Sequence, residues 1–211
     1  MKRGHRGFVI GMTGGVAVGK SVLAGLLRHR GAALLSLDEV AHSLYEPGRP
    51  VWHAIIAKFG RRVLGPGSRV DRRILGRLVF GSRRALETLD GLVHPALRGE
   101  ASNAISRMRF RHQLVVVEAG PLLFRLDAHK LVDAGVLVIC RRHDRIRRLM
   151  EGRGMPRTGA EARLAASLME EKVLAGRIRE LRRNMTIVTS GDAEQLRASA
   201  ARILGAVKSW T

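Results

Sequence analysis

Short apolar runs bounded by turn residues recur along the chain. Five of these runs have the length and the β-branched content of buried strands, at residues 7–12, 33–37, 114–120, 134–140 and 185–189. Segments with helical periodicity separate them, at 20–30, 38–46, 50–59, 72–80, 84–92, 95–110, 143–152, 159–181 and 192–207. Strands that alternate with helices are typical of a parallel sheet covered on both faces. The pattern therefore predicts an α/β fold around a five-stranded parallel sheet.

The interval between the second and third predicted strands holds only helices. It runs from about residue 41 to residue 111, which is long for a simple connection. We expect a helical region over 41–111, large enough to bind a substrate, within a single domain of 211 residues. The sheet core then comprises 7–40, 112–140 and 184–211.

The composition is that of a globular protein. Hydrophobic residues make up 45% and charged residues 27%, and the single cysteine excludes an internal disulfide. No apolar stretch approaches the roughly 20 residues of a membrane span. The N-terminus MKRGHRGFVIGM is basic and then apolar, but its apolar part is short and leads directly into a glycine-rich loop. We therefore expect a cytoplasmic protein without a membrane segment, whose apolar start is a strand rather than a signal peptide.

The net charge of +20 predicts attraction to polyanions. Only six of the 38 basic residues are Lys, and the Arg residues are spread over most of the chain. Aromatic residues are only 4%, so the stacking platforms of a dedicated nucleic-acid module are missing. We interpret the charge as an Arg-rich composition with some phosphate-binding positions. It predicts non-specific RNA attraction at low salt and no specific nucleic-acid partner.

The stretch GMTGGVAVGKS contains a phosphate-binding motif. From Gly14 to Ser21 it fits G-x-x-x-x-G-K-[ST], the P-loop, with a predicted strand before it and a predicted helix after it. In such a loop, consecutive backbone N–H groups and the helix N-terminus bind phosphate. Lys20 would then reach the β- and γ-phosphates, and the Ser21 hydroxyl would bind Mg²⁺. The alternative is a purely structural turn.

The middle of this loop reads V-A-V where another glycine is usual. The phosphate donors are backbone groups, so the side chains need not remove them. An Ala forced into the left-handed region costs roughly 1 kcal/mol or more, and Val18 is β-branched and stiff. We expect the loop to persist at some cost in affinity.

Two carboxylates follow predicted strands. Asp38 comes after the second strand, at the sheet edge where ligands of open α/β sheets bind, and could orient or deprotonate an attacking hydroxyl. It could also cap the following helix, and one residue can do both. Glu118 ends the third strand, where it would hold Mg²⁺ through a water or remain a surface carboxylate.

The sequence resembles the bacterial dephospho-coenzyme A kinases. The segments GMTGGVAVGKS, LDEVAHSLYEPGRPVW, VDRRILGRLVF, GLVHPAL and GPLLF match that family in order and spacing, over roughly residues 7–175. The resemblance implies a three-layer P-loop kinase with a coenzyme-binding helical region and a lid at 141–170. It also implies the activity, transfer of the γ-phosphate of ATP to the ribose 3′-hydroxyl of dephospho-coenzyme A, with Mg²⁺, in the last step of coenzyme A biosynthesis.

The resemblance also assigns site residues. ATP would be held by the loop and the residue after it, Gly14, Gly15, Val16, Ala17, Val18, Gly19, Lys20, Ser21 and Val22. Asp38 matches the family's base, and the coenzyme would be recognised by Thr13, Asp38, Arg72, His94 and Pro95. Arg148 and Arg153 match lid arginines that clamp the transferring phosphate, Arg148 in a catalytic role and Arg153 in ATP binding. Alternatively, both arginines lie on a solvent-exposed helix face and have no role in the site.

Several positions depart from the family pattern. Ser36, Arg125 and Ser167 stand where the family has Asp, a carboxylate and Gln, and the stretch 184–192 is also altered. These departures leave a degenerate paralogue, which binds nucleotide or coenzyme A without efficient turnover, as the alternative to an active kinase. A P-loop protein associated with RNA through its arginines is a third hypothesis. The joint presence of Lys20 and Asp38 with the loop glycines favours the kinase.

Overall fold

The five predicted strands form one sheet. The computed structural model describes residues 6–190 and 193–211. Its strands are β1 (Phe8–Thr13), β2 (Ala33–Ser36), β3 (Leu114–Glu118), β4 (Ala134–Ile139) and β5 (Asn184–Val188). All neighbours pair in parallel, in the order β2-β3-β1-β4-β5. The predicted five-stranded parallel sheet is confirmed.

Helices connect these strands. They are α1 (Lys20–His29), α2 (Leu37–Ser43), α3 (Pro50–Phe59), α4 (Arg72–Phe80), α5 (Arg83–Arg111), α6 (Leu122–Arg125), α7 (Arg142–Arg153), α8 (Arg157–Arg179) and α9 (Ala193–Trp210). Three short 3₁₀ turns complete the described part, at Arg61–Val63, Pro66–Ser68 and Ala128–Leu131. None of the helices in the described part of the chain is both long and apolar enough to cross a membrane.

The chain divides into two compact units. One comprises the chain up to Ser36 together with the chain from Ala104 onward, and contains the whole sheet. The other, Leu37–Asn103, is helical and contains α2, α3, α4 and most of α5. The proposed assignment of a coenzyme-binding region and a lid to parts of these units stays a prediction.

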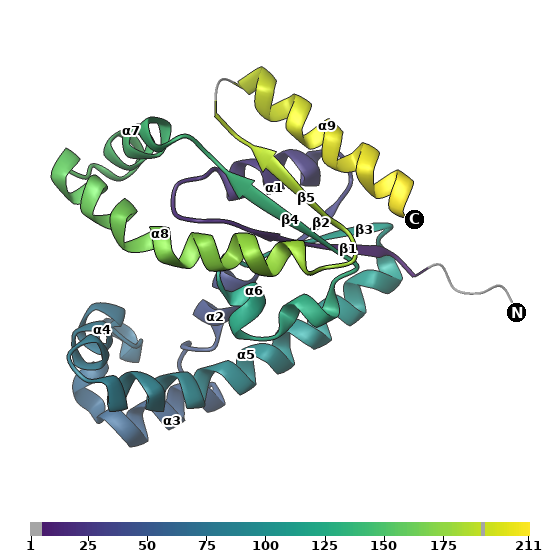
Figure 1. Cartoon of the computed structure of the whole chain (residues 1–211). Coiled ribbons are helices and arrows are strands. Elements are labelled where there is room, and N and C mark those ends of the chain that lie inside the picture. Colours follow the sequence, from purple (N-terminus) through teal and green to yellow (C-terminus); the bar gives the residue numbers. More distant parts are fainter. Residues whose placement is uncertain (1–5, 191–192) are drawn as a thin grey trace, which may run out of the picture. The chain divides into compact units, whose positions relative to one another are not determined.

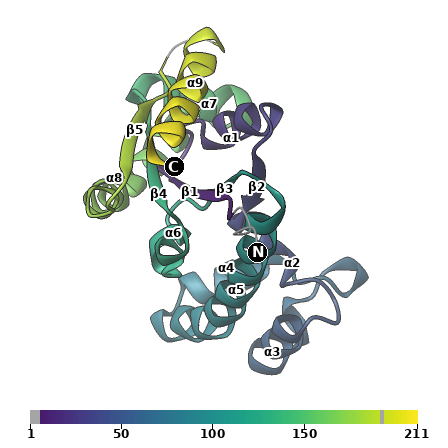
Figure 2. The same cartoon turned by 90° about the vertical axis from the view of Figure 1, so that its right-hand side faces the viewer.

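The sheet is the middle layer of the first unit. Helices α1 and α9 lie on one face and α6 and α8 on the other (Figure 1), and Figure 2 shows the same two layers from the side. The alternation along β1 produces this arrangement, because successive side chains of a strand point to opposite faces. Ile10 and Met12 enter the core under α1 and α9, whereas Gly11 faces α6, where a Cβ would come within 2.8 Å of the Leu123 side chain.

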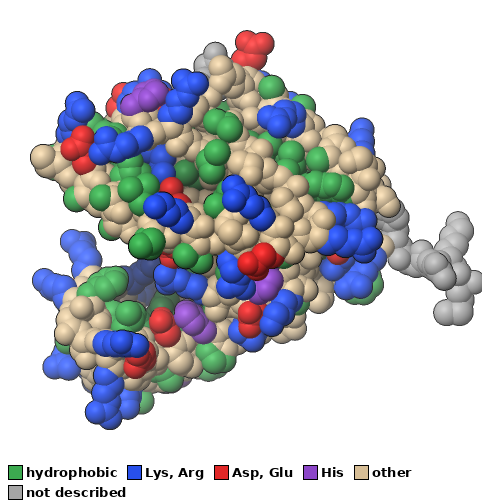
Figure 3. All heavy atoms as spheres, in the orientation of Figure 1, with side chains coloured by type: hydrophobic (Ala, Val, Ile, Leu, Met, Phe, Trp, Pro, Cys, Tyr) green, Lys and Arg blue, Asp and Glu red, His purple; other side chains and the backbone are tan. Residues whose placement is uncertain are grey.

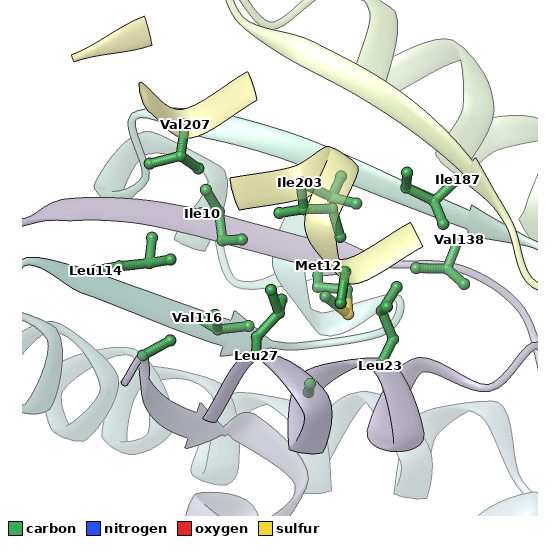
Figure 4. Close-up of a cluster of buried hydrophobic side chains, with 14 of the residues drawn as sticks. Ile10, Met12, Leu23, Leu27, Leu114, Val116, Val138, Ile187, Ile203 and Val207 are labelled. Carbon is green, nitrogen blue, oxygen red and sulfur yellow. The ribbon is translucent and has the colours of Figure 1, made fainter. Parts of the chain in front are cut away.

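The main core lies between the sheet and the α1–α9 pair. Figure 4 shows Leu23 and Leu27 of α1 and Ile203 and Val207 of α9 directed at side chains of the strands. The central members have no exposed surface, among them Ile10, Met12, Leu23, Leu27, Val116, Val138, Ile187 and Ile203. This packing fixes α1, and with it the loop that precedes α1.

One helix prediction was wrong. We expected separate helices at 84–92 and 95–110, but the structure has one 29-residue helix, α5, with Pro95 inside it. Proline removes one backbone hydrogen bond, which favours a break but does not require one. The buried residues Val93, Leu97 and Ala101 lie four residues apart on one face and continue across Pro95. The burial of this face on both sides of Pro95 outweighs the tendency of proline to end the helix.

Candidate active site

The motif from Gly14 to Ser21 forms the loop between β1 and α1 and the first residues of α1, as predicted. Gly14 and Gly19 have φ values of 148° and 88°, in the region that favours glycine. A Cβ on Gly14 would also collide with the carbonyl oxygen of Val138. Ala17 is the one non-glycine residue of the loop with positive φ, at 56°. The strained position therefore falls on the smallest side chain of the V-A-V sequence.

The side chains of the V-A-V sequence, residues 16–18, pack against apolar residues of the protein. Val18 is 1% exposed and belongs to the main core. Val16 and Ala17 pack against an apolar cluster between α7 and α8, made of Ile146, Leu149, Ala160 and Leu164. These contacts offset the cost of replacing glycine, and they fix the loop to the helices that follow β4.

Three successive carbonyl groups of the loop are held from outside. Arg145 Nε donates to the Val16 oxygen over 2.8 Å, and Arg148 Nη1 donates to the Ala17 oxygen over 3.3 Å. The Thr189 hydroxyl donates to the Val18 oxygen. None of the described peptide bonds is cis, so the N–H of each peptide unit points away from its carbonyl. The N–H groups after these carbonyls therefore share the opposite side of the loop, an arrangement that can cradle phosphate.

The two polar side chains at the start of α1 lie at this loop. Lys20 Nζ donates to the carbonyl oxygens of Gly14 and Gly15 at 2.8 and 2.7 Å. The Ser21 hydroxyl donates to Glu118 Oε1 over 2.6 Å. This hydroxyl–carboxylate pair consists of hard oxygen ligands, which suit Mg²⁺. Within the described residues, no group of three or more acidic, His or Cys side chains could hold a metal by itself.

Thr13 and Val22 flank the loop. Thr13 is fully buried, and its hydroxyl donates to the Gly120 carbonyl oxygen over 2.5 Å. This bond ties the end of β1 to the turn after β3. Val22 is 56% exposed on the first turn of α1.

The predicted lid arginines have different surroundings. Arg148 donates to the Thr189 carbonyl oxygen over 2.7 Å as well as to Ala17, so it binds the loop from the α7 side. Arg153 is exposed at the last residue of α7, and no hydrogen bond joins it to the loop in the part of the chain that the structure describes. Sequence reasoning missed Arg145, which is buried beside Val16. No local signal distinguishes it in the run RRHDRIRR.

Two departures from the family pattern have ion-pair or hydrogen-bond partners on α8. Arg125 of α6 pairs with Glu170 over 2.6 Å. Ser167 donates to Glu171 Oε1 over 2.7 Å, and Glu171 in turn pairs with Arg145. Part of the altered stretch 184–192, residues 191 and 192, lies outside the described residues.

The remaining predicted residues lie in the helical unit. Asp38 is exposed in the first turn of α2. The expectation that it caps this helix was wrong, because α2 begins one residue earlier, at the fully buried Leu37. A carboxylate inside the first turn still interacts favourably with the helix dipole. His94 Nε2 lies 3.6 Å from Asp90 Oδ1, and Pro95 is exposed.

Arg72 is the first residue of α4, and Asp71 caps that helix. The backbone N–H groups of Ile74 and Arg73 donate to the Asp71 carboxylate and lower its pKa below the ordinary value of 3.8. The Arg72 guanidinium contacts Nε2 of His42. Burial raises the pKa of the nearby Tyr45 above its ordinary value of 10.0, against the opposing charge of Arg72. Residues 71–74, 76 and 77 line a cavity of about 620 Å³, and three of them are arginines.

A P-loop between the first strand of a parallel sheet and a helix places this chain among the P-loop kinases. Shikimate kinase from Bacteroides thetaiotaomicron shares the fold, with a TM-score of 0.55 at 14% identity, over 95% of this chain and 98% of that one. The family model described as dephospho-CoA kinase matches residues 8–180. The chain belongs to the dephospho-CoA kinase family, and it is a phosphotransferase.

Individual relatives agree with this membership. The dephospho-CoA kinase of Moorella thermoacetica is 39% identical over 194 residues, covering 91% of this chain and 88% of its own length. That of Anaeromyxobacter dehalogenans is 36% identical, covering 93% and 90%. Among solved structures, TT1252 from Thermus thermophilus is similar with a TM-score of 0.74 at 29% identity, over 95% of this chain and 97% of that one.

Proposed function

We propose that this chain transfers the γ-phosphate of ATP to the ribose 3′-hydroxyl of dephospho-coenzyme A, yielding coenzyme A. One observation carries the proposal. In a chain 39% identical to a dephospho-CoA kinase, the carbonyls of Val16, Ala17 and Val18 are all held from outside the loop. The opposite N–H groups are therefore available to a phosphate, so the V-A-V sequence supports phosphate binding.

The loop and Lys20 form the donor side of the proposed site. The N–H groups that follow the three carbonyls would bind the β-phosphate, assisted by the N-terminus of α1. Lys20 would exchange its bonds to the Gly14 and Gly15 carbonyls for bonds to the β- and γ-phosphates. Since these carbonyls already hold the ammonium at the loop, the exchange needs little movement of the Lys20 side chain.

The Ser21–Glu118 pair fits a magnesium ion. Ser21 would supply a direct oxygen ligand, while Glu118 would accept a hydrogen bond from its hydroxyl and hold a water of the ion. When bound, Mg²⁺ would neutralise charge on the β- and γ-phosphate oxygens. The hydrogen bond from Ser21 keeps a lone pair of its oxygen free for this role.

The proposed acceptor side consists mainly of residues of the helical unit. Asp38 follows the end of β2 by two residues, and its exposed carboxylate could accept the proton of the attacking hydroxyl. Arg72 belongs to the arginine-lined cavity at the start of α4, whose charge suits the phosphates of a coenzyme. His94 and Pro95 complete the acceptor set that we propose. Thr13 would act on the site by fixing the end of β1 through Gly120.

Two arginines of α7 are candidates for stabilising charge on the phosphoryl group in transfer. Arg148 contacts the loop at Ala17, and its guanidinium also holds the end of β5 through Thr189. Arg153 is exposed at the end of the same helix. A guanidinium near the transferring group would neutralise developing negative charge on its oxygens.

The degenerate alternative finds no support in the described residues. Arg125 and Ser167, which depart from the family pattern, form ordinary contacts with Glu170 and Glu171. The contacts of Lys20 with the Gly14 and Gly15 carbonyls and of Ser21 with Glu118 support an active site at this loop. We therefore propose an active kinase.

Product analysis with modified acceptors tests this proposal. Incubation with Mg-ATP and dephospho-coenzyme A should add one phosphate to the acceptor, detected by mass spectrometry. An acceptor that lacks the 3′-hydroxyl should remain unmodified, whereas the matched 2′-deoxy acceptor should be phosphorylated. Phosphorylation of the 3′-deoxy acceptor would contradict the proposed reaction.

A further inference from the structure

Arg145 is a buried charge at the edge of the phosphate-binding loop. Its side chain is 5% exposed, and it lies on α7 beside the apolar residues Ile146 and Leu149 that pack on the loop. A buried guanidinium is costly unless it is paired and hydrogen-bonded. The contacts of Arg145 therefore indicate what this charge does.

Those contacts divide into a charge partner and the loop itself. Both oxygens of Glu171, from α8, accept from the two Nη atoms, with the Nη1–Oε2 distance at 2.7 Å. Ser167 contacts Nη2 over 3.3 Å and also donates to Glu171. The remaining Nε–H donates to the carbonyl oxygen of Val16 over 2.8 Å. The carboxylate thus neutralises and orients the guanidinium, and leaves its Nε directed at the loop.

The Arg145–Glu171 pair lies directly against the loop backbone. A Cβ on Gly15 would collide with Glu171 Oε1 and would come within 2.7 Å of Arg145 Nη2. Gly15 does not have positive φ, so its small size here serves close approach rather than backbone conformation. The helix α8 is thereby joined to the loop through Glu171.

The bond to Val16 acts on one particular peptide unit. It holds the carbonyl of Val16 toward α7, which directs the N–H of Ala17 to the phosphate side of the loop. Ala17 has φ of 56°, a conformation that costs an L-residue about 1 kcal/mol or more. Rotation of this peptide unit would relieve that strain and withdraw the donor. The bond from Arg145 opposes the rotation.

We propose that Arg145, held by Glu171, is a positioning residue for nucleotide binding: it fixes the Val16–Ala17 peptide so that the Ala17 N–H can bind phosphate. The proposal rests on the proposed function only in requiring that the loop binds the phosphates of a nucleotide. It explains how a loop with V-A-V in its middle keeps its donors aligned. Arg145 would act through the backbone and make no direct bond to the phosphates.

Calorimetric titration with Mg-ADP tests this role in the whole chain. Arg145→Ala should weaken ADP binding about tenfold, which corresponds to the loss of about one hydrogen bond to a charged group. The ADP affinity of Arg145→Lys should lie between those of Arg145→Ala and the unmodified chain, because a lysine cannot bind Val16 and both Glu171 oxygens together. Arg147→Ala is the matched control, since Arg147 is exposed on the same helix and pairs only with Asp144 among the described residues. It should bind ADP like the unmodified chain.

Kinetics separate positioning from other roles. The KM for ATP should rise in Arg145→Ala by the factor seen for ADP, while the KM for dephospho-coenzyme A stays unchanged. An unchanged ADP affinity with only a lower melting temperature would overturn the proposal, since it would make Arg145 merely structural. A lower kcat at unchanged ADP affinity would also overturn it, because Arg145 would then act on the transferring group.

Glu171→Gln is a second variant that tests the same role of Arg145 if Arg145→Ala does not fold. This variant preserves the shape of the side chain but breaks the two-oxygen pairing with Arg145, so ADP binding should weaken about threefold or more. Unchanged binding would contradict the proposal. ADP titration involves no acceptor, so these results are independent of whether dephospho-coenzyme A is the substrate.

Discussion

The Ser21 hydroxyl donates to Glu118 Oε1 over 2.6 Å, although 97 positions separate the two residues in the chain. The register of the sheet explains the contact, because Met12 at the end of β1 lies opposite Glu118 at the end of β3. The loop after β1 then brings Ser21 back to the same edge. The carboxylate at this strand end therefore belongs to the proposed nucleotide site.

Replacing Glu118 with Gln should raise the Mg²⁺ concentration needed for half-maximal rate. Groups that orient a metal ligand typically contribute about 10- to 100-fold in metal affinity or activity, so we expect at least about a tenfold increase. The initial rate measured against Mg²⁺ concentration checks this. Glu151→Gln, on the exposed side of α7, should leave the curve unchanged. An unaltered Mg²⁺ requirement in Glu118→Gln would separate this residue from the metal.

Substitutions of Ala17 should follow its positive φ. Ala17→Val should lower both the nucleotide affinity and the melting temperature, because a β-branched residue is poorly accommodated at φ of 56°. Ala17→Gly should change the free energy of unfolding by less than about 1 kcal/mol, since relieved strain and added chain entropy oppose each other. Nucleotide titration and thermal unfolding of both variants check this. Equal nucleotide affinity and equal melting temperature in the two variants would show that the backbone at Ala17 is not strained.

The core between α1 and the sheet should carry much of the stability. Leu27→Ala should lower the free energy of unfolding by about 2–5 kcal/mol, because Leu27 has no exposed surface. Leu168→Ala is the control, since Leu168 is 47% exposed on α8, and it should cost less than about 0.5 kcal/mol. Urea unfolding measures both. A small loss for Leu27→Ala would mean that the packing is looser than the structure shows.

Asp71 should make the stability of the chain depend on pH in the acidic range. Its folded-state pKa is lowered by the N–H groups of Ile74 and Arg73, so its stabilisation is fully present above about 3.8 and is lost as the pH falls through the folded-state pKa. Asp71→Asn keeps a capping oxygen but removes the titration. The difference in melting temperature between the two proteins should be constant between about pH 5 and 7 and should shrink below about pH 4. A difference that does not vary with pH would show that the charge of Asp71 is not involved.

The sheet and the phosphate loop could be predicted because their signals are local. Each strand is an apolar run, and the loop is a motif that follows one of them. The division of α5 at Pro95 was wrong because the burial of Val93 and Leu97 depends on tertiary packing. A proline is visible in the sequence, whereas the surface that a helix packs against is not.

The supports of the loop could not be predicted because their partners are distant in sequence. Arg145 meets Val16 across 129 positions and Glu171 across 26. The run 141–148 is rich in arginine, and no sequence signal there separates the buried Arg145 from the half-buried Arg148 and the exposed arginines. The predicted lid arginines were therefore chosen by resemblance to a family, whereas the contacts of Arg145 with Val16 and Glu171 appear only in the structure. Lys and Arg side chains are otherwise spread over the surface seen in Figure 3.

We propose that this chain is an active kinase whose V-A-V loop binds the phosphates of ATP. ADP release with Mg-ATP, measured with and without dephospho-coenzyme A, tests it most directly when Lys20→Ala and Asp38→Asn are measured alongside. We expect acceptor-dependent release from the unmodified chain and a loss of about 100-fold or more in each variant, with ADP binding retained in Asp38→Asn. Bound nucleotide without acceptor-dependent release from the unmodified chain would contradict the claim and indicate a binding protein instead.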